Sequence, residues 1–176
     1  MDQNWDRTSL KLADLSKQII SIHLIAYPSP SREDDDEPFE LTNHWCFFLE
    51  FKHEKSVRLE IVPGYGSDGL RGKVKLTSKT HACTTNDLCK LSFKVHGRVS
   101  LEKIIEIIQS EGRQRYQFAP GWEGCRFWNF TLMQDLEARN IVSSGAADKA
   151  CNSMVWFYHS VRGANRRDMK IGTFLG

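Results

Sequence analysis

The period of the apolar residues changes once along this chain, near Gly97, and this change most constrains the fold. Before it, apolar residues alternate with polar ones, as at Val57, Leu59 and Ile61. Alternation with a period of two is typical of a half-exposed antiparallel strand. After Gly97 the apolar spacing in residues 101–108 becomes i, i+3, i+4 and i+7, which predicts a helix. The order of the two patterns predicts an α+β domain, with an antiparallel sheet ahead of a helical C-terminal half.

The sheet is expected to contain about five strands, because five runs combine β-branched or aromatic residues with turn residues at their ends. The second run is apolar on both faces, so we place it at the centre of the sheet, in a hairpin with the third. The five runs cover residues 19–27, 43–51, 56–62, 72–78 and 90–96.

About three helices are expected after the strands. Ser100 has the character of an N-cap, with Glu102 in the first turn and Gly112 at the end of the first helix. The second helix is predicted over residues 125–139, which are rich in aromatic and aliphatic side chains, and the third over residues 146–160.

The length of 176 residues fits a single domain. We expect residues 1–17 to form a flexible, polar N-terminal arm, residues 18–161 a single α+β domain, and residues 162–176 a basic, mobile tail. Residues 32–37 include five consecutive carboxylates, which predicts a solvated loop.

Composition excludes several function classes. The 24 basic and 22 acidic residues nearly balance, so the chain lacks the basic surface that nucleic-acid binding requires. The five cysteines form no CxxC pair, which indicates reduced thiols in a cytoplasmic protein. No signal peptide, membrane span, phosphate-binding loop or metal-ligand spacing is recognisable. We therefore expect no cofactor and no metal, and the sequence leaves the oligomeric state unknown.

Two places in the sequence could support chemistry. Cys125 opens the predicted aromatic helix, where the helix dipole and unsatisfied amides favour the thiolate that acts as a nucleophile. His44 lies on the central strand, where its imidazole could deprotonate that thiol. Glu60 or Arg58 on the neighbouring strand could orient the imidazole. Packing roles for the cysteine and the histidine remain the alternative at this point.

The order of His44-Trp45 on a strand, a hairpin partner and Cys125 at a helix start resembles the circularly permuted papain-like fold. The lecithin:retinol acyltransferase-like proteins carry H-W-x-x-Y followed by N-C-E-H-F, and this chain has H-W-C-F-F and G-C-R-F-W. The resemblance implies a small acyl-transfer enzyme, with Cys125 as nucleophile and His44 as base. The second histidine of those proteins falls at Ser56, so Glu60 is the nearby candidate for orienting His44.

The run from Tyr116 to Glu137 also resembles an uncharacterised fungal family of single-domain proteins, some encoded beside natural-product biosynthesis genes. On these grounds we favour a thiol-dependent hydrolase or acyltransferase that acts on an amide or ester of a small-molecule or peptide-like substrate. Two alternatives stay open: a natural-product cyclase or isomerase with an aromatic-lined pocket, and a catalytically inactive binding module. The residues expected to contact the substrate are Arg58, Trp45, Trp122, Trp128 and Arg126.

Overall fold

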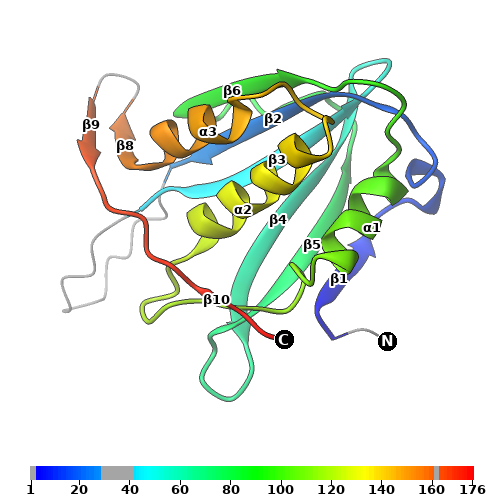
Figure 1. The fold of residues 1–176 in the computed structure, drawn as a ribbon. Helices are drawn as coiled ribbons and strands as arrows, with labels where there is room; N and C mark the ends of the chain where they lie inside the picture. Colours follow the sequence, from blue (N-terminus) through cyan, green and yellow to red (C-terminus); the bar gives the residue numbers. More distant parts are fainter. Residues whose placement is uncertain (1–2, 29–41, 161–162) are drawn as a thin grey trace.

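The computed structural model describes residues 3–28, 42–160 and 163–176 and has one large, curled sheet with helices on one side (Figure 1). The main sheet has eight strands in the order β10-β7-β5-β4-β3-β2-β6, and β1 pairs with β5. Its pairs are antiparallel except for β1 and β5, which run parallel. The strands are Trp5–Ser9 (β1), Ile19–Tyr27 (β2), His44–Phe51 (β3), Lys55–Tyr65 (β4), Arg71–Lys79 (β5), Cys89–Lys94 (β6), Tyr116–Gln117 (β7) and Thr173–Phe174 (β10), with Trp156–Ser160 (β8) and Gly163–Arg166 (β9) in a separate two-stranded sheet.

Three α-helices come after β6, as the change in period predicts, although β7 to β10 lie between and after them. They are Leu101–Ser110 (α1), Cys125–Ala138 (α2) and Ala146–Met154 (α3), and a short 3₁₀ helix covers Leu12–Asp14. The Ser100 side chain accepts a hydrogen bond from the backbone N–H of Lys103, which confirms the predicted N-cap of α1.

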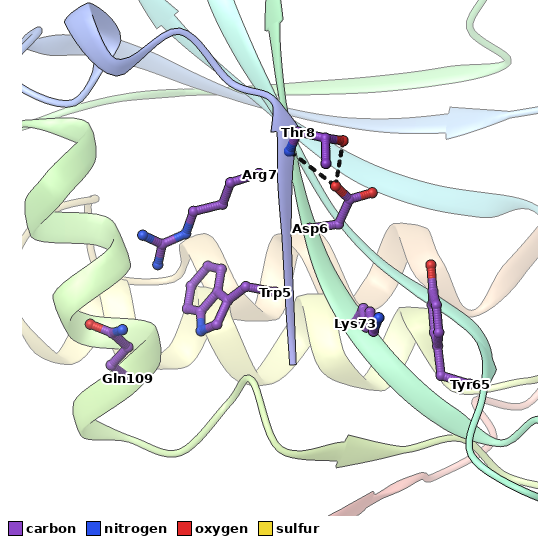
Figure 2. A pocket seen from close by; sticks show the side chains of 7 residues that line it. All are labelled: Trp5, Asp6, Arg7, Thr8, Tyr65, Lys73 and Gln109. Atoms are coloured by element: carbon purple, nitrogen blue, oxygen red, sulfur yellow. Dashed lines mark hydrogen bonds between the residues drawn. The ribbon is translucent and has the colours of Figure 1, made fainter. Parts of the chain in front are cut away.

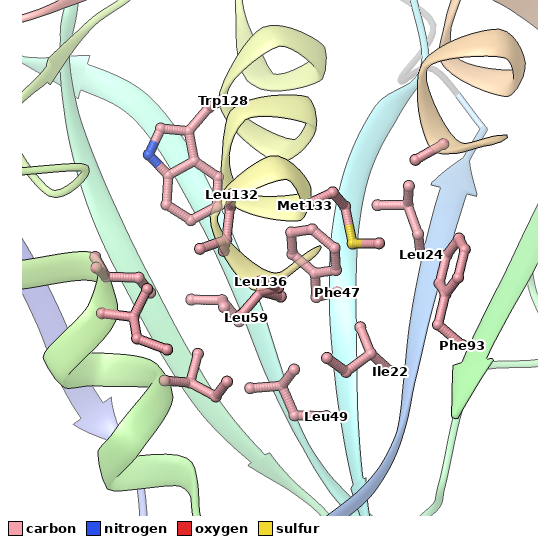
Figure 3. Packing of buried hydrophobic residues seen from close by; sticks show 14 of the residues in the cluster. Ile22, Leu24, Phe47, Leu49, Leu59, Phe93, Trp128, Leu132, Met133 and Leu136 are labelled. Carbon is pink, nitrogen blue, oxygen red and sulfur yellow. The ribbon is translucent and has the colours of Figure 1, made fainter. Parts of the chain in front are cut away.

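The main hydrophobic core lies between the helices and one face of the sheet (Figure 3). Alternate residues of β2, β3 and β4 point toward α2, whose buried side chains include Trp128, Leu132, Met133 and Leu136. The central strand β3 also carries a smaller cluster on its opposite face, formed by Cys46, Phe48 and Ile25 of β2. β3 is therefore apolar on both faces and central in the sheet, as predicted.

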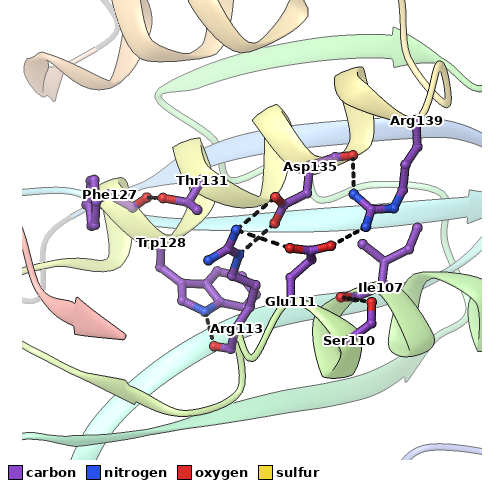
Figure 4. A network of polar contacts seen from close by, with 9 residues as sticks. All are labelled: Ile107, Ser110, Glu111, Arg113, Phe127, Trp128, Thr131, Asp135 and Arg139. Atoms are coloured by element: carbon purple, nitrogen blue, oxygen red, sulfur yellow. Dashed lines mark hydrogen bonds and ion pairs between the residues drawn. The ribbon is translucent and has the colours of Figure 1, made fainter. Parts of the chain in front are cut away.

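A polar network joins the end of α1 to α2 along the edge of this core (Figure 4). Arg113 makes two hydrogen bonds to the carboxylate of Asp135, at 2.7 and 2.9 Å. Arg139 is paired with Glu111 and also donates to the backbone oxygen of Asp135. A two-pronged arginine–carboxylate contact fixes orientation as well as distance, so the network sets the position of α2 over the sheet.

The structure differs from the sequence expectations at both ends of the chain. Residues 5–9, expected in a flexible arm, form β1 because their backbone hydrogen-bonds to the edge of β5. The C-terminal residues, expected to be mobile, include β9 and β10 and are held by side chains of α2 and β7. The third helix ends at Met154, and residues 156–160 form β8 instead.

The main sheet consequently has more strands than the five that the sequence predicts. The additional ones are short or lie at an edge, where tertiary pairing rather than local pattern decides the conformation. The predicted acidic loop at residues 32–37 lies outside the described residues.

Candidate active site

The candidate site lies where β3 separates from β4. The β3–β4 pairing runs from Phe47↔Leu59 to Phe51↔Lys55, whereas β3 itself begins at His44 and stays paired there with β2. The first residues of β3 therefore extend past the end of the β3–β4 pairing.

Helix α2 occupies the place that β4 leaves. The Asn129 Nδ2 donates to the backbone oxygen of Trp45 at 2.9 Å, and the Cys125 thiol contacts the backbone oxygen of Asn43 at 3.9 Å. Residues four apart share one face of a helix, so Cys125 and Asn129 meet the strand together. The Asn129 amide therefore satisfies a backbone oxygen that a neighbouring strand would otherwise satisfy, and Cys125 lies beside another.

Cys125 is the first residue of α2, and no side chain caps this helix end. The backbone N–H groups of the first turn have no acceptor within the helix, and the helix dipole makes this end positive. Gly124 adopts a φ of 137°, and a Cβ at that position would lie 2.8 Å from the Tyr116 hydroxyl. The Tyr116 hydroxyl donates to the Gly124 backbone oxygen at 2.8 Å and accepts from the N–H of Gly172 at 3.1 Å. Tyr116 therefore fixes the peptide that precedes the thiol.

His44 connects the thiol to a carboxylate. Its Nε2 lies 2.7 Å from Oε2 of Glu60, and its pKa responds to Cys125 as well as to Glu60. Burial opposes the charged imidazolium, but the hydrogen bonds to Cys125 and Glu60 and their negative charges raise the pKa of His44 to about 9.

The pKa of the Cys125 thiol is shifted downward, whereas that of His44 is shifted upward. Burial by itself raises the pKa of Cys125, but hydrogen bonding and charge from His44 lower it overall, with help from the Trp45 N–H and the Arg126 charge. A lowered thiol pKa beside a raised imidazole pKa favours the thiolate–imidazolium pair near neutral pH.

Glu60 is held in place by two cationic partners. Glu60 is only 5% exposed, and its Oε2 also accepts a hydrogen bond from Nη2 of Arg58 at 2.6 Å. Burial raises the pKa of Glu60, but His44 and Arg58 lower it overall, so the carboxylate is charged. The Arg58 guanidinium stacks on the ring of Tyr27, with its carbon 4.8 Å from the ring centre. Arg58, which the sequence predicted to contact the substrate, thus binds the Glu60 carboxylate, and that carboxylate in turn binds His44.

The other residues expected to bind substrate are distributed differently. Trp45 and Trp128 are fully buried in the main core, and Trp128 Nε1 donates to the backbone oxygen of Arg113. Trp122 is 47% exposed and is the member of the predicted set with a large exposed surface. Arg126 is buried and donates to backbone oxygens of Met154, Arg167 and Asp168.

Sequence reasoning missed two residues that position this site. Asn129 fixes β3 against α2, and its Oδ1 is buried with no hydrogen-bond partner among the described residues. The signal for it was an asparagine one turn after Cys125, among the aromatic residues at the start of the helix. Tyr116 begins the run that carries the family resemblance, but no local pattern indicates that its hydroxyl would meet Gly124.

A second histidine makes a similar set of contacts elsewhere on the sheet. His23 of β2 has Nε2 at 2.9 Å from Glu50 Oε2 and Nδ1 at 2.8 Å from the Ser92 hydroxyl. His23 and Ser92 are direct partners in the β2–β6 ladder, so this arrangement sits on regularly paired strands.

The sequence model of one protein family, described as "Domain of unknown function (DUF7770)", matches residues 22–175 of this chain. The match covers most of the sequence. The chain belongs to this family. The description gives the family no activity, and the single-domain organisation expected from the sequence is consistent with it. No curated protein and no solved structure matches the chain.

Two further features are absent from the described part of the chain. It contains no group of three or more histidine, cysteine, aspartate or glutamate side chains that could hold a metal ion. Among the same residues, no helix combines the length and apolar character needed to cross a membrane.

Proposed function

We propose that this protein is a thiol-dependent hydrolase or acyltransferase that acts on an amide or ester, with Cys125 as nucleophile, His44 as base and Glu60 as orienter. The observation that carries the proposal is the position of the His44 ring, which lies 2.7 Å from a buried carboxylate and lowers the pKa of the thiol. A nucleophile, a base and a group that orients the base form the arrangement that nucleophilic catalysis requires.

In the first step, the Cys125 thiolate attacks the substrate carbonyl and forms a carbon–sulfur bond. The negative charge that develops on the carbonyl oxygen is stabilised by backbone N–H groups of the first turn of α2. His44 then gives its proton to the leaving amine or alcohol as the bond between carbonyl carbon and leaving group breaks, which leaves a thioester on Cys125.

In the second step, water or an acceptor alcohol or amine loses a proton to His44 and attacks the thioester. The thiolate is released, and the imidazolium is restored beside it. Glu60 keeps its charge throughout and stabilises the imidazolium. The His44 side chain is 28% exposed, whereas Cys125 is 9% exposed, so we expect the acyl group to approach the sulfur from the side of His44.

The low exposure of Cys125 favours a second candidate, a binding module of the same architecture without chemistry. In that case the only role of the thiol is to donate a hydrogen bond to the backbone oxygen of Asn43, just before β3. The two candidates differ in the reactivity of the sulfur, because a thiolate is alkylated far faster than a buried, protonated thiol.

The test is brief alkylation with iodoacetamide at neutral pH, followed by intact-protein and peptide mass spectrometry, together with hydrolysis of p-nitrophenyl acetate. We expect Cys125 to be modified first among the five cysteines, and Cys125→Ala to abolish both labelling and turnover with little change in melting temperature. Cys151→Ser is the matched control, because Cys151 is also part of a helix but burial raises its pKa. Equal labelling of both cysteines, or slower labelling of Cys125, would contradict the proposal.

A further inference from the structure

Strands β8 and β9 lie outside the main sheet, next to α3 (Figure 1). Among the strands that the structure describes, they pair only with each other. The backbone N–H of Arg167 donates to the backbone oxygen of Val155 at 2.8 Å and extends this pairing by one bond. We call residues 154–160 and 163–168 the β8–β9 pair. Since no backbone ladder joins this pair to the main sheet, side chains make the connection.

One of these side chains is Asn43, the residue before His44. Its Oδ1 accepts from the backbone N–H of Tyr158 at 2.7 Å, and its Nδ2 donates to the backbone oxygen of Tyr158 at 2.8 Å. A residue of an antiparallel neighbour exchanges the same two bonds, so the amide takes the place of a strand beside β8. The Nδ2 also donates to the backbone oxygen of Tyr27, at the end of β2, at 3.0 Å. Asn43 is 1% exposed, and its amide thus links β2 and β8 at the start of β3.

The second side chain is Arg126, the residue after Cys125. Its Nη1 donates to the backbone oxygens of Met154 and Arg167 at 2.9 and 2.8 Å, and its Nη2 donates to that of Asp168 at 2.8 Å. Met154 precedes β8, and the other two acceptors follow β9, so one guanidinium binds both ends of the pair. The donors of a guanidinium point in fixed directions, and these contacts therefore fix the β8–β9 pair against the first turn of α2.

Each anchor is next in sequence to one of the two groups proposed to react. Consecutive residues share a planar peptide unit, so a shift of Asn43 moves the backbone of His44, and a shift of Arg126 moves that of Cys125. The two anchors also meet at the site, because the Cys125 thiol contacts the backbone oxygen of Asn43 at 3.9 Å. A displacement of about 1 Å between reacting groups can cost about 100-fold in rate.

We propose that Asn43 and Arg126 are positioning residues, through which the β8–β9 pair holds His44 and Cys125 in register. This inference rests on the function proposed above for these two groups. The side chains of both anchors bind backbone groups of the protein, so Arg126 acts on the thiol through the position of α2, whereas the sequence predicted that it contacts the substrate.

The experiment measures the rate of Cys125 alkylation by iodoacetamide as a function of pH, followed by peptide mass spectrometry. We expect Asn43→Ala to raise the midpoint of the pH profile by about one unit and to slow alkylation near pH 7 about tenfold, because the thiolate loses the aligned imidazolium. Arg126→Lys should have a similar effect although a cation remains beside Cys125, because a lysine cannot reach all three acceptors at once.

Arg126→Gln separates position from charge. The Arg126 charge itself favours the thiolate, so this variant should be slower than Arg126→Lys. A wild-type profile in Arg126→Lys, with slowing only in Arg126→Gln, would show that the charge alone acts and would overturn the positioning role of Arg126. Arg126→Lys also decides the proposal if Asn43→Ala does not fold.

The double variant Asn43→Ala, Arg126→Lys tests whether both anchors act through the same β8–β9 pair. We expect it to be within about twofold of the slower single variant, because loss of either anchor already releases the pair. Additive slowing, about 100-fold in total, would show two independent effects and would overturn the shared mechanism.

Two carboxylates away from the site provide the controls. Asp14 is buried and accepts from the Ser78 hydroxyl at the far end of β5, and Asp6 of β1 accepts two hydrogen bonds from Thr8 (Figure 2). Asp14→Ala and Asp6→Ala should leave the midpoint unchanged, even where the melting temperature falls. A shift in Asp14→Ala as large as that in Asn43→Ala would show that lost stability is the cause, and would overturn the proposal.

Hydrolysis of p-nitrophenyl acetate distinguishes this proposal from the function on which it rests. A lowered wild-type midpoint without turnover would contradict the acyl-transfer function, while shifts in the two single variants would still support the positioning roles. A lowered wild-type midpoint that both variants retain would overturn the positioning roles alone. A wild-type midpoint at the ordinary value of a thiol would contradict both.

Discussion

The two histidines of the sheet, His44 and His23, make parallel contacts in different surroundings. Each has a glutamate on Nε2 and a second partner, which is Cys125 for His44 and the Ser92 hydroxyl for His23. Ser92 sits within a regular ladder, opposite His23. Cys125 instead opens a helix that enters the gap between β3 and β4.

The comparison indicates that the proposed site needs more than a histidine held by a carboxylate. A hydroxyl is a weak nucleophile unless its surroundings also stabilise the charge that develops on the substrate. At His44 the separated strands and the start of α2 bring a polarisable thiol and unsatisfied amides together. At His23 the paired strands supply structural hydrogen bonds. The proposed chemistry therefore belongs to the place where the sheet opens.

The largest expected effect distinguishes the Cys125 thiol from the Ser92 hydroxyl. Cys125→Ala should lower the turnover of p-nitrophenyl acetate by at least about 10³-fold, because the thiolate forms the covalent intermediate. Ser92→Ala should leave the rate unchanged. The measurement is steady-state hydrolysis with both variants at equal folded concentration. A loss of turnover in Ser92→Ala alone would reverse the assignment of the two regions.

The next effect compares the two bases. His44→Gln should slow the alkylation of Cys125 near pH 7 by about 10- to 100-fold, because the thiolate loses the imidazolium that lowers its pKa. His23→Gln should leave alkylation unchanged and lower the free energy of unfolding by about 1 kcal/mol, through loss of two hydrogen bonds. Stopped-time alkylation and urea unfolding measure the two quantities. Similar alkylation rates in both variants would show that His44 does not act on the thiol.

A smaller effect is expected for the two carboxylates. Glu60→Gln should lower turnover about tenfold, because the neutral amide no longer favours the imidazolium of His44. Glu50→Gln should change turnover less than about twofold, since Glu50 contacts His23 instead. Substrate concentration series separate kcat from KM, and the expected loss lies in kcat. A loss in KM alone would assign Glu60 to substrate binding.

The smallest expected effect is the pH dependence of the free energy of unfolding, which tests the Cys125–His44 ion pair. The pKa of His44 rises from 6.5 to about 9, so its contribution is complete below pH 6.5 and is lost up to about pH 9. The pKa of Cys125 is lowered from 9.0, so its contribution is complete above pH 9 and is lost as pH falls through the lowered value.

Above both pH 6.5 and the lowered pKa of Cys125, the loss at His44 and the gain at Cys125 offset each other up to about pH 9. The contribution of the pair should therefore stay level within that window and above it. Urea unfolding of the wild type, minus the same series for a Cys125→Ala, His44→Gln double variant, gives this contribution. A difference that varies steadily across the window would exclude the thiolate–imidazolium pair.

Local sequence pattern determined the long elements of this fold. Alternation predicted the strand near 56–62, β-branched and apolar content predicted those near 19–27 and 43–51, and the i, i+3, i+4 spacing predicted α1. These elements follow from the pattern because each buries one or both faces in a core that the pattern itself defines. The sequence also drew attention to Cys125, His44 and Glu60 through residue type and position, while their chemical roles remain proposals.

Tertiary structure alone decided the rest. Strands β1 and β10 form only because the edges of β5 and β7 offer unpaired backbone groups to otherwise polar or short segments. Tertiary structure also decided that Trp128 and Arg126 are buried, because their hydrogen-bond partners lie 15 or more residues away in the chain. The opening between β3 and β4, which brings His44 to the thiol, depends on where two strands stop pairing. A periodic pattern specifies which face of a strand is buried, but it carries no information about the residue at which its neighbour departs.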